Sequence, residues 1–125
     1  MSYKTYNQLG GSKTDSDVIS VVELKTNEQK QQVITSNDVC VIDVYASWCG
    51  PCKTAAPIFA KMSLQYNSPG KCMLVKQNIE NNLTNDTQIL SVPIFLFYKK
   101  GELVHTINGA DMQSIKNKID QLLIN

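Results

Sequence analysis

Two cysteines with the spacing of a redox pair are the clearest candidates for chemistry in this sequence. Cys49 and Cys52 enclose Gly50 and Pro51, after an apolar run and before a stretch with helical spacing. A cysteine at a helix start faces free backbone N–H groups and the positive end of the helix dipole, which favour its thiolate. We therefore predict that Cys49 attacks a disulfide of another molecule. Cys52 lies about one helical turn further on, within reach to resolve the resulting mixed disulfide.

Two other interpretations of the pair are a metal site and a pair of small buried side chains. Structural zinc sites usually have a second Cys-x-x-Cys or a pair of histidines. This chain has one histidine, His105, and two single cysteines, Cys40 and Cys72. The spacing leaves open a zinc site made of all four cysteines. Because the Cys-x-x-Cys pair stands at a predicted helix start, however, redox chemistry is favoured and we predict no metal. Cys40 and Cys72 begin apolar runs and are interpreted as buried, non-catalytic thiols, with regulatory oxidation as the alternative.

Composition excludes several classes of function. The 125 residues carry twelve basic residues, all of them lysine, against eleven acidic ones, for a net charge of +1. Near-neutrality argues against nucleic-acid and anionic-membrane partners. The hydrophobic fraction of 42% suffices for a core, but no apolar stretch approaches the about 20 residues that span a bilayer. The polar N-terminus lacks the apolar segment of a secretory signal, so we predict a cytoplasmic location. We also expect the protein to be a monomer.

The elements that position the cysteines alternate between β-rich and helical runs. Strands are predicted at 18–22, 39–46, 72–75, 94–98 and 103–107. Helices are predicted from about 27 to 35, from the cysteine pair to a turn at 67–70, weakly toward Leu90, and along the Met112–Leu122 stripe. The order βαβαβαββα indicates an α/β fold with a central mixed five-stranded sheet and four flanking helices. Residues 1–16 are predicted to be a flexible tail and residues 17–125 a single domain.

The run from Trp48 to Lys53 (WCGPCK) resembles the active-site signature of the thioredoxin family, and the similarity extends over residues 18–125. Further matches are the family's buried acid, the lysine beside it, the cis-proline dipeptide and the glycine of the substrate groove. The resemblance implies a thioredoxin fold. It implies catalytic roles for Cys49, Cys52, Asp43 and Lys76, and substrate-binding roles for Trp48, Gly50, Pro51, Val92, Pro93 and Gly109.

The matched acid, Asp43, would exchange a proton with Cys52. A carboxyl group on a doubly buried strand should have a raised pKa unless Lys76 or water compensates its charge. Such an acid could take the proton of the resolving thiol and return it. The alternative is a purely structural pair between Asp43 and Lys76.

The matched dipeptide and tryptophan would contact the substrate. The resemblance implies a cis bond before Pro93, which would leave the Val92 backbone free to pair with a peptide as an added strand. The alternative is an ordinary trans proline at a strand start. Trp48 is interpreted as an apolar lid over the site, or alternatively as a half-exposed core aromatic. One departure from the family is Ile94, which stands where a threonine is common.

Taken together, the sequence predicts a reductase of protein disulfides. Pro51, in place of histidine, is the reducing-type pattern of the family. Both electrons are carried by sulfur, so no bound cofactor is needed, and the resemblance implies NADPH and a thioredoxin reductase as the electron source. The predicted partners are disulfide-containing proteins and that reductase. The alternatives are a binding subunit of a larger complex that uses the same groove, and a disulfide isomerase or oxidase.

Overall fold

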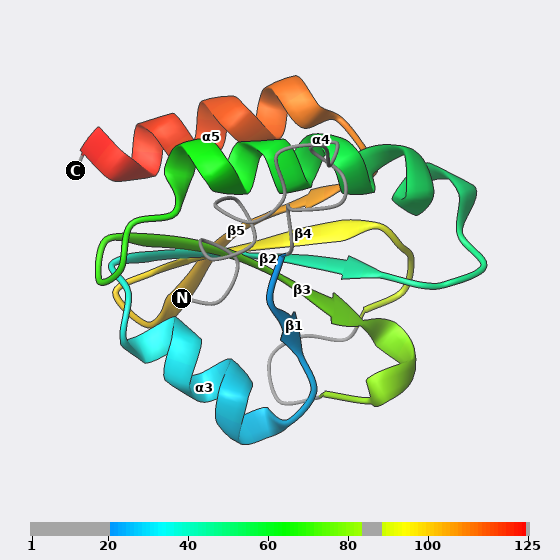
Figure 1. Ribbon diagram of the computed structural model, residues 1–125, viewed down its shortest axis with the longest axis horizontal. Coiled ribbons are helices and arrows are strands. Elements are labelled where there is room, and N and C mark those ends of the chain that lie inside the picture. Colours follow the sequence, from blue (N-terminus) through cyan, green and yellow to red (C-terminus); the bar gives the residue numbers. More distant parts are fainter. Residues whose placement is uncertain (1–20, 84–88, 125) are drawn as a thin grey trace, which may run out of the picture.

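The computed structural model of the protein describes residues 21–83 and 89–124, which form a sheet with helices on both faces (Figure 1). Its strands are β1 (Glu23–Leu24), β2 (Val39–Tyr45), β3 (Cys72–Asn78), β4 (Ile94–Lys99) and β5 (Glu102–Asn108). Its helices are α3 (Asn27–Thr35), α4 (Gly50–Tyr66), α5 (Met112–Ile124) and the short 3-10 helix η1 (Ile79–Asn81).

The central strand of the sheet is β2, which ends close to the cysteine pair. The strand order is β1-β3-β2-β4-β5. Because β2 pairs parallel with β3 and antiparallel with β4, the sheet is mixed, as predicted. All residues of β2 are buried except Tyr45, which is half-buried. The apolar run therefore forms the strand covered on both faces that the sequence predicted.

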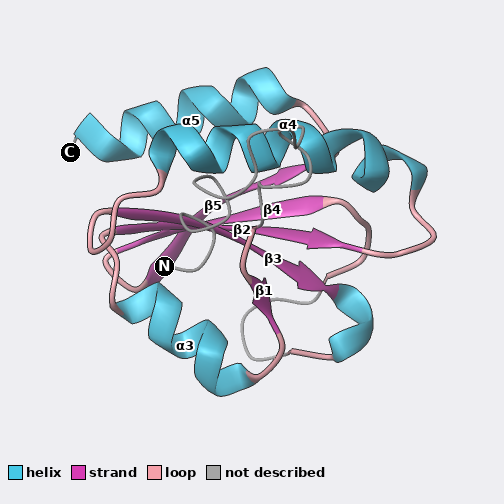
Figure 2. Ribbon diagram, viewed as in Figure 1, coloured by secondary structure: helices cyan, strands magenta, loops and turns pink. Residues whose placement is uncertain are grey.

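Two apolar layers fix the helices to the sheet. Helices α4 and α5 cover one face and α3 covers the other (Figure 2). The first layer packs Phe59 of α4 and Ile115 of α5 against Phe95 of β4. In the second layer, Ile34 of α3 packs with Ile42 of β2. Burying both faces in this way holds β2, and with it the start of α4, in a fixed position.

Local sequence signals set two of the element boundaries. Thr26 caps α3 through a reciprocal pair of hydrogen bonds with Gln29, which confirms the predicted helix start. The β4–β5 hairpin turns on Lys100 and Gly101, whose φ angles are 51° and 86°. Two positive φ angles in a two-residue loop give the turn whose twist matches that of paired strands.

The first strand differs from its prediction. The strand predicted at 18–22 lies partly outside the described residues, and Val21 and Val22 are not in a strand. Instead, β1 comprises Glu23 and Leu24, which pair with Lys76 and Gln77 of β3. The reason is that β-branched composition indicates a strand, whereas pairing with a neighbour decides which residues form it.

The segment after β3 also differs in part. Where a weak helix was expected toward Leu90, the described residues show only η1, and residues 84–88 lie outside the described part. The predicted tail at 1–16 lies outside it as well. Among residues 21–83 and 89–124, no helix has the length and apolarity needed to cross a membrane.

Candidate active site

The cysteine pair lies where β2 gives way to α4. Cys49 is the N-cap of α4, and its backbone N–H donates to the Ala46 carbonyl oxygen at 3.2 Å. The Cys49 Sγ accepts a hydrogen bond from the Cys52 backbone N–H, also at 3.2 Å. Pro51 lies in the first turn, where the missing N–H of proline leaves no helix bond unmade. The sulfur predicted to be the nucleophile thus faces a backbone donor at the positive end of the helix.

The two cysteines are joined by a disulfide, with their Cα atoms 5.3 Å apart. Both side chains are almost fully buried, with 5% of Cys49 and 4% of Cys52 exposed. Gly50 and Pro51 between them are exposed. Trp48 is 70% exposed, so the interpretation of it as a half-exposed core aromatic is wrong. Its indole forms part of the surface next to the disulfide.

A cis-proline loop borders the disulfide on the side of β4. The Val92–Pro93 peptide bond is cis, as the family resemblance implied, so the trans alternative is wrong. The Val92 carbonyl oxygen lies 3.8 Å from the Cys49 Sγ. The Pro93 carbonyl oxygen accepts a hydrogen bond from the Gly109 N–H at 2.8 Å. These contacts bring Val92, Pro93 and Gly109 together beside the pair.

Gly109 has a φ of +89°, a conformation that disfavours any residue with a Cβ. A Cβ at this position would meet no atom within 4 Å. Glycine is therefore needed here for the backbone conformation and not for a close contact. The space above it is open, in agreement with the groove that the resemblance implies.

Asp43 lies beneath the pair, in the interior. Only 4% of its surface is exposed, and its Oδ1 has no hydrogen-bond partner among the described residues. Burial raises the pKa of Asp43 to about 7, against a smaller lowering by the Lys76 ammonium. Asp43 and Cys52 line one cavity of about 220 Å³. A carboxyl group that titrates near neutral pH is thus close to the buried cysteine.

Asp43 and Lys76 do not form the structural ion pair that was the alternative interpretation. The two residues face each other across β2 and β3. The Lys76 Nζ lies instead 5.9 Å from the centroid of the Tyr45 ring. Within the described residues the ion pairs are Lys99–Asp38 and Lys116–Asp120, and Lys76 belongs to neither. Asp43 is therefore not a satisfied structural acid.

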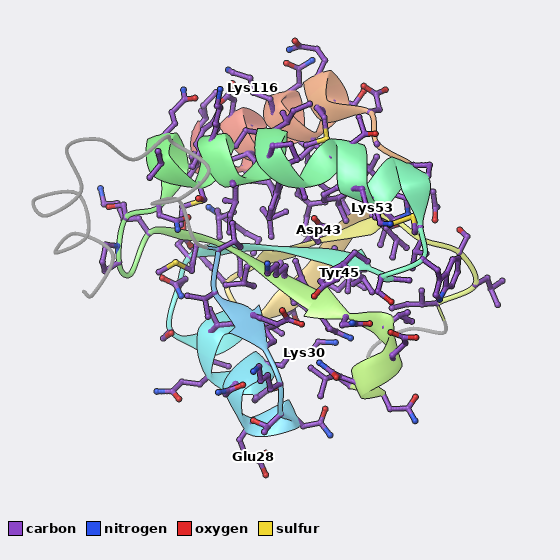
Figure 3. All side chains as sticks on the ribbon, turned by 45° about the vertical axis from the view of Figure 1, so that its right-hand side comes forward. Glu28, Lys30, Asp43, Tyr45, Lys53 and Lys116 are labelled. Atoms are coloured by element: carbon purple, nitrogen blue, oxygen red, sulfur yellow. A yellow bond between two sulfur atoms is a disulfide. The ribbon has the colours of Figure 1, made fainter. Side chains whose placement is uncertain are left out.

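Sequence reasoning missed part of this cavity. Its other lining residues are Tyr45, Ala46, Ser47, Lys53, Ala56 and Lys76. In Figure 3, Asp43 lies between Tyr45 and the part of α4 that carries Lys53, near the disulfide. The position of Tyr45 could have been found, because side chains two residues apart on a strand point to one face. Lys53 belongs to the quoted WCGPCK run, but nothing in the run showed where its side chain lies.

The remaining cysteines lie in the two apolar layers. Cys40 is buried in the second layer, beneath α3, and Cys72 in the first layer, beneath α4 and α5; both are free thiols. Burial raises the pKa of each to about 12, so neither is a nucleophile near neutral pH. The interpretation as buried thiols is confirmed. The four cysteines do not converge, and the described residues hold no cluster of three or more metal-binding side chains. His105 is an exposed residue of β5.

Comparison with known proteins settles the family. The family model described as Thioredoxin matches residues 20–121. The chain belongs to the thioredoxin family. Thioredoxin 1 of Plasmodium falciparum is 31% identical over 104 residues, which cover 81% of this chain and 97% of that protein. Thioredoxin-2 of Saccharomyces cerevisiae is 32% identical over 100 residues, covering 79% and 95%.

Other similar proteins differ in length and agree in fold. The chain spans about a third of thioredoxin-like protein 1 of Schizosaccharomyces pombe. The two are 29% identical over 103 residues, which cover 81% of this chain and 35% of that protein. A solved structure of Plasmodium falciparum thioredoxin superposes with a TM-score of 0.73 at 29% identity, covering 81% of this chain and 98% of that one. The thioredoxin fold predicted from the sequence is therefore confirmed. The chain is a disulfide oxidoreductase of this family, with Cys49 and Cys52 as its redox-active pair.

Proposed function

We propose that this thioredoxin reduces disulfides in other proteins, with Cys49 as the attacking residue and Cys52 as the resolving one. The observation that carries the proposal is Cys49 at the N-cap of α4, its sulfur facing the Cys52 N–H. In the reduced protein this donor and the helix dipole stabilise a thiolate on Cys49. Cys52, one helical turn later, is close enough to Cys49 to form a disulfide with it.

The reaction proceeds in two exchanges. The Cys49 thiolate attacks one sulfur of a substrate disulfide, forms a mixed disulfide and expels the other substrate sulfur as a thiolate. Cys52 then transfers its proton to the Asp43 carboxylate and attacks the Cys49 sulfur, which releases the second substrate thiolate. The protein leaves this step as the Cys49–Cys52 disulfide, and the substrate has gained two electrons. Asp43 is suited to this transfer because its pKa lies near ambient pH.

The surface around the pair supplies the substrate contacts. Exposed Trp48 and the open space above Gly109 flank the disulfide. The Val92 backbone, next to the Cys49 sulfur, is placed to pair with an extended substrate segment. Gly50 and Pro51 complete the exposed rim around the sulfurs. Recognition of backbone and apolar surface suits an enzyme that accepts many different proteins.

The oxidised protein must be reduced again before another turnover. We propose NADPH as the electron source, through a thioredoxin reductase that attacks the Cys49–Cys52 disulfide at the same surface. No other bound group is required, since the two sulfurs carry both electrons. We also propose that the protein acts as a monomer in the cytoplasm.

An insulin-reduction assay tests the activity, with dithiothreitol or NADPH and a thioredoxin reductase as donor. Wild type should precipitate the insulin B chain, and a variant carrying both Cys49→Ser and Cys52→Ser should not. Cys52→Ser alone should trap substrates as mixed disulfides, and a further Cys49→Ser change should abolish trapping. Failure of wild type with both donors would overturn the proposal, and trapping by Cys49→Ser alone would reverse the order of attack. Fusion of a fluorescent protein to the N-terminus, and in a second experiment to the C-terminus, would show by microscopy in which compartment the protein lies.

A further inference from the structure

A tyrosine and a glutamate beside Asp43 form a group that the redox mechanism has not used. Tyr45 is two residues beyond Asp43 on β2, so both side chains lie on one face of the sheet. The Tyr45 hydroxyl donates a hydrogen bond to the Glu23 Oε2, on β1, at 2.7 Å. The strand register places Glu23 on one side of Lys76 and Asp43 on the other. Two carboxylates thus flank a single ammonium.

The ammonium of Lys76 lies over the aromatic ring, and among the described residues it forms no ion pair with either carboxylate. Its Nζ lies 5.9 Å from the centroid of the Tyr45 ring, within the range in which a ring attracts a cation. In the described part of the chain, Lys76 forms no ion pair with Glu23 or Asp43. The hydrogen bond to Glu23 fixes the ring in this position. The ring that lies nearest the ammonium is thus held by the glutamate.

We propose that Tyr45 and Glu23 are positioning residues, which hold the Lys76 ammonium near Asp43 and keep it out of contact with that carboxylate. The proposal rests on the proposed role of Asp43 as proton acceptor for Cys52. An ammonium in contact with a carboxylate stabilises its charge and makes it a weaker base. An ammonium held at the ring leaves Asp43 able to take a proton near neutral pH.

The other groups that face Asp43 do not provide this control. The charged and titratable side chains around it come from four elements: Cys52 and Lys53 on α4, Lys76 on β3, Glu23 on β1 and Tyr45 on β2. The neighbour of Asp43 on β4 is the apolar Phe95, and α5 buries apolar Ile115 and Ile119 on this face. Substitutions at Glu23 or Tyr45 leave Lys53 and Cys52 in place. Because Glu23→Gln also removes a negative charge from the surroundings of Asp43, the comparison of leucine with phenylalanine at position 45, at constant charge, isolates the position of the Lys76 charge.

The test measures the titration midpoint of Asp43 in the reduced protein by carboxyl-carbon NMR, with the pH profile of insulin reduction as second readout. Glu23→Gln keeps an oxygen for the Tyr45 hydroxyl and removes the competing charge, so the ammonium moves toward Asp43. The midpoint should fall by about one pH unit, the lower end of the effect of an opposite charge in contact. Adding Tyr45→Leu to Glu23→Gln should lower it further. Adding Tyr45→Phe instead should not, since the ring remains.

A second tyrosine provides a matched control. Tyr66 donates to Asp120, and Lys116 Nζ lies 5.9 Å from the centroid of its ring, between α4 and α5 and away from the redox pair. Tyr66→Leu should leave the midpoint of Asp43 unchanged, and Lys76→Met should raise it.

An unchanged or raised midpoint in Glu23→Gln would overturn the proposal, as would no response to Lys76→Met. Equal effects of leucine and phenylalanine at position 45 would also overturn it. The conservative Glu23→Gln change keeps the test valid where the leucine variant does not fold. Should wild type fail to reduce insulin, the proposed function fails, whereas the NMR midpoints still decide the positioning of Lys76.

Discussion

Replacement of Asp43 by asparagine should change how the stability of the oxidised protein depends on pH. Only 4% of the surface of Asp43 is exposed, and burial raises the pKa of its carboxyl group from the ordinary 3.8 to about 7. Between these values the folded state holds a proton that the unfolded state has lost. The free energy of unfolding therefore falls as pH rises from about 4 to about 7. With about 1.4 kcal/mol for each pKa unit, a shift of about three units corresponds to a loss of about 4 kcal/mol.

Urea unfolding followed by far-UV circular dichroism, from pH 2.5 to pH 9, measures this quantity. The stability of Asp43→Asn relative to wild type should rise by about 4 kcal/mol between pH 4 and pH 8. Any constant effect of burying the amide cancels in that difference. If the free energy of unfolding of the two proteins depended on pH in the same way over this range, the reasoning would be refuted, because Asp43 would then have the same pKa in the folded and unfolded states.

Asp38→Asn serves as the control of opposite sign. The Lys99 ammonium bonded to Asp38 holds the pKa of this carboxyl below its usual range. A lowered pKa contributes stability that is present above about pH 4 and lost as pH falls further. The stability difference between wild type and Asp38→Asn should thus be flat from pH 5 to pH 9 and shrink in acid.

Three further outcomes can be measured with the same proteins. Lys99→Met removes an ammonium bonded to a carboxylate at 2.7 Å and to a carbonyl near the end of α5 at 2.8 Å, and should lower the free energy of unfolding by about 2 kcal/mol. Lys116→Met removes an exposed ion pair with Asp120 and a weak contact with the Tyr66 ring, and should change the free energy of unfolding by about 0.5 kcal/mol or less; a loss equal to that of Lys99→Met would contradict this. Gly109→Ala should lower the free energy of unfolding by about 1–2 kcal/mol, because residue 109 has a positive φ, whereas Gly50→Ala should leave it unchanged. An unchanged free energy of unfolding in Gly109→Ala would show that the backbone adapts. In the folded, reduced protein at pH 8, iodoacetamide should leave Cys40 and Cys72 unmodified and should reach them only in urea, as measured by mass spectrometry of the peptides; modification of either thiol in the folded protein would contradict its burial.

Much of the site could be predicted because its signals are local in sequence. The placement of Cys49 at a helix start follows from an apolar strand, a Gly-Pro turn and helical spacing within a few residues. The capping of α3 by Thr26 is local in the same way, and so is the two-residue hairpin at Lys100 and Gly101. Family resemblance added Pro93 and Gly109, which are distant in sequence from the cysteines and meet them through the fold.

What could not be predicted depends on pairing between strands. Glu23 follows the strand predicted at 18–22, and only the register with β3 brings it beside Lys76. The direction of the Lys76 side chain, toward the Tyr45 ring and not toward Asp43, is a matter of packing that residue types do not determine. Composition likewise predicted strand at Val21 and Val22, which are not in one, because it carries no information on which residues pair with a neighbouring strand.

The disulfide closes a very small ring, since its cysteines are only three positions apart in the chain. A cross-link removes disorder from the unfolded chain in proportion to the logarithm of the loop it encloses, and a loop of this size gives about 2 kcal/mol. This bond consequently contributes near the low end of what a disulfide can add, and the two apolar layers supply the rest of the stability. Such a protein can pass repeatedly between its oxidised and reduced forms while the rest of the molecule keeps its shape.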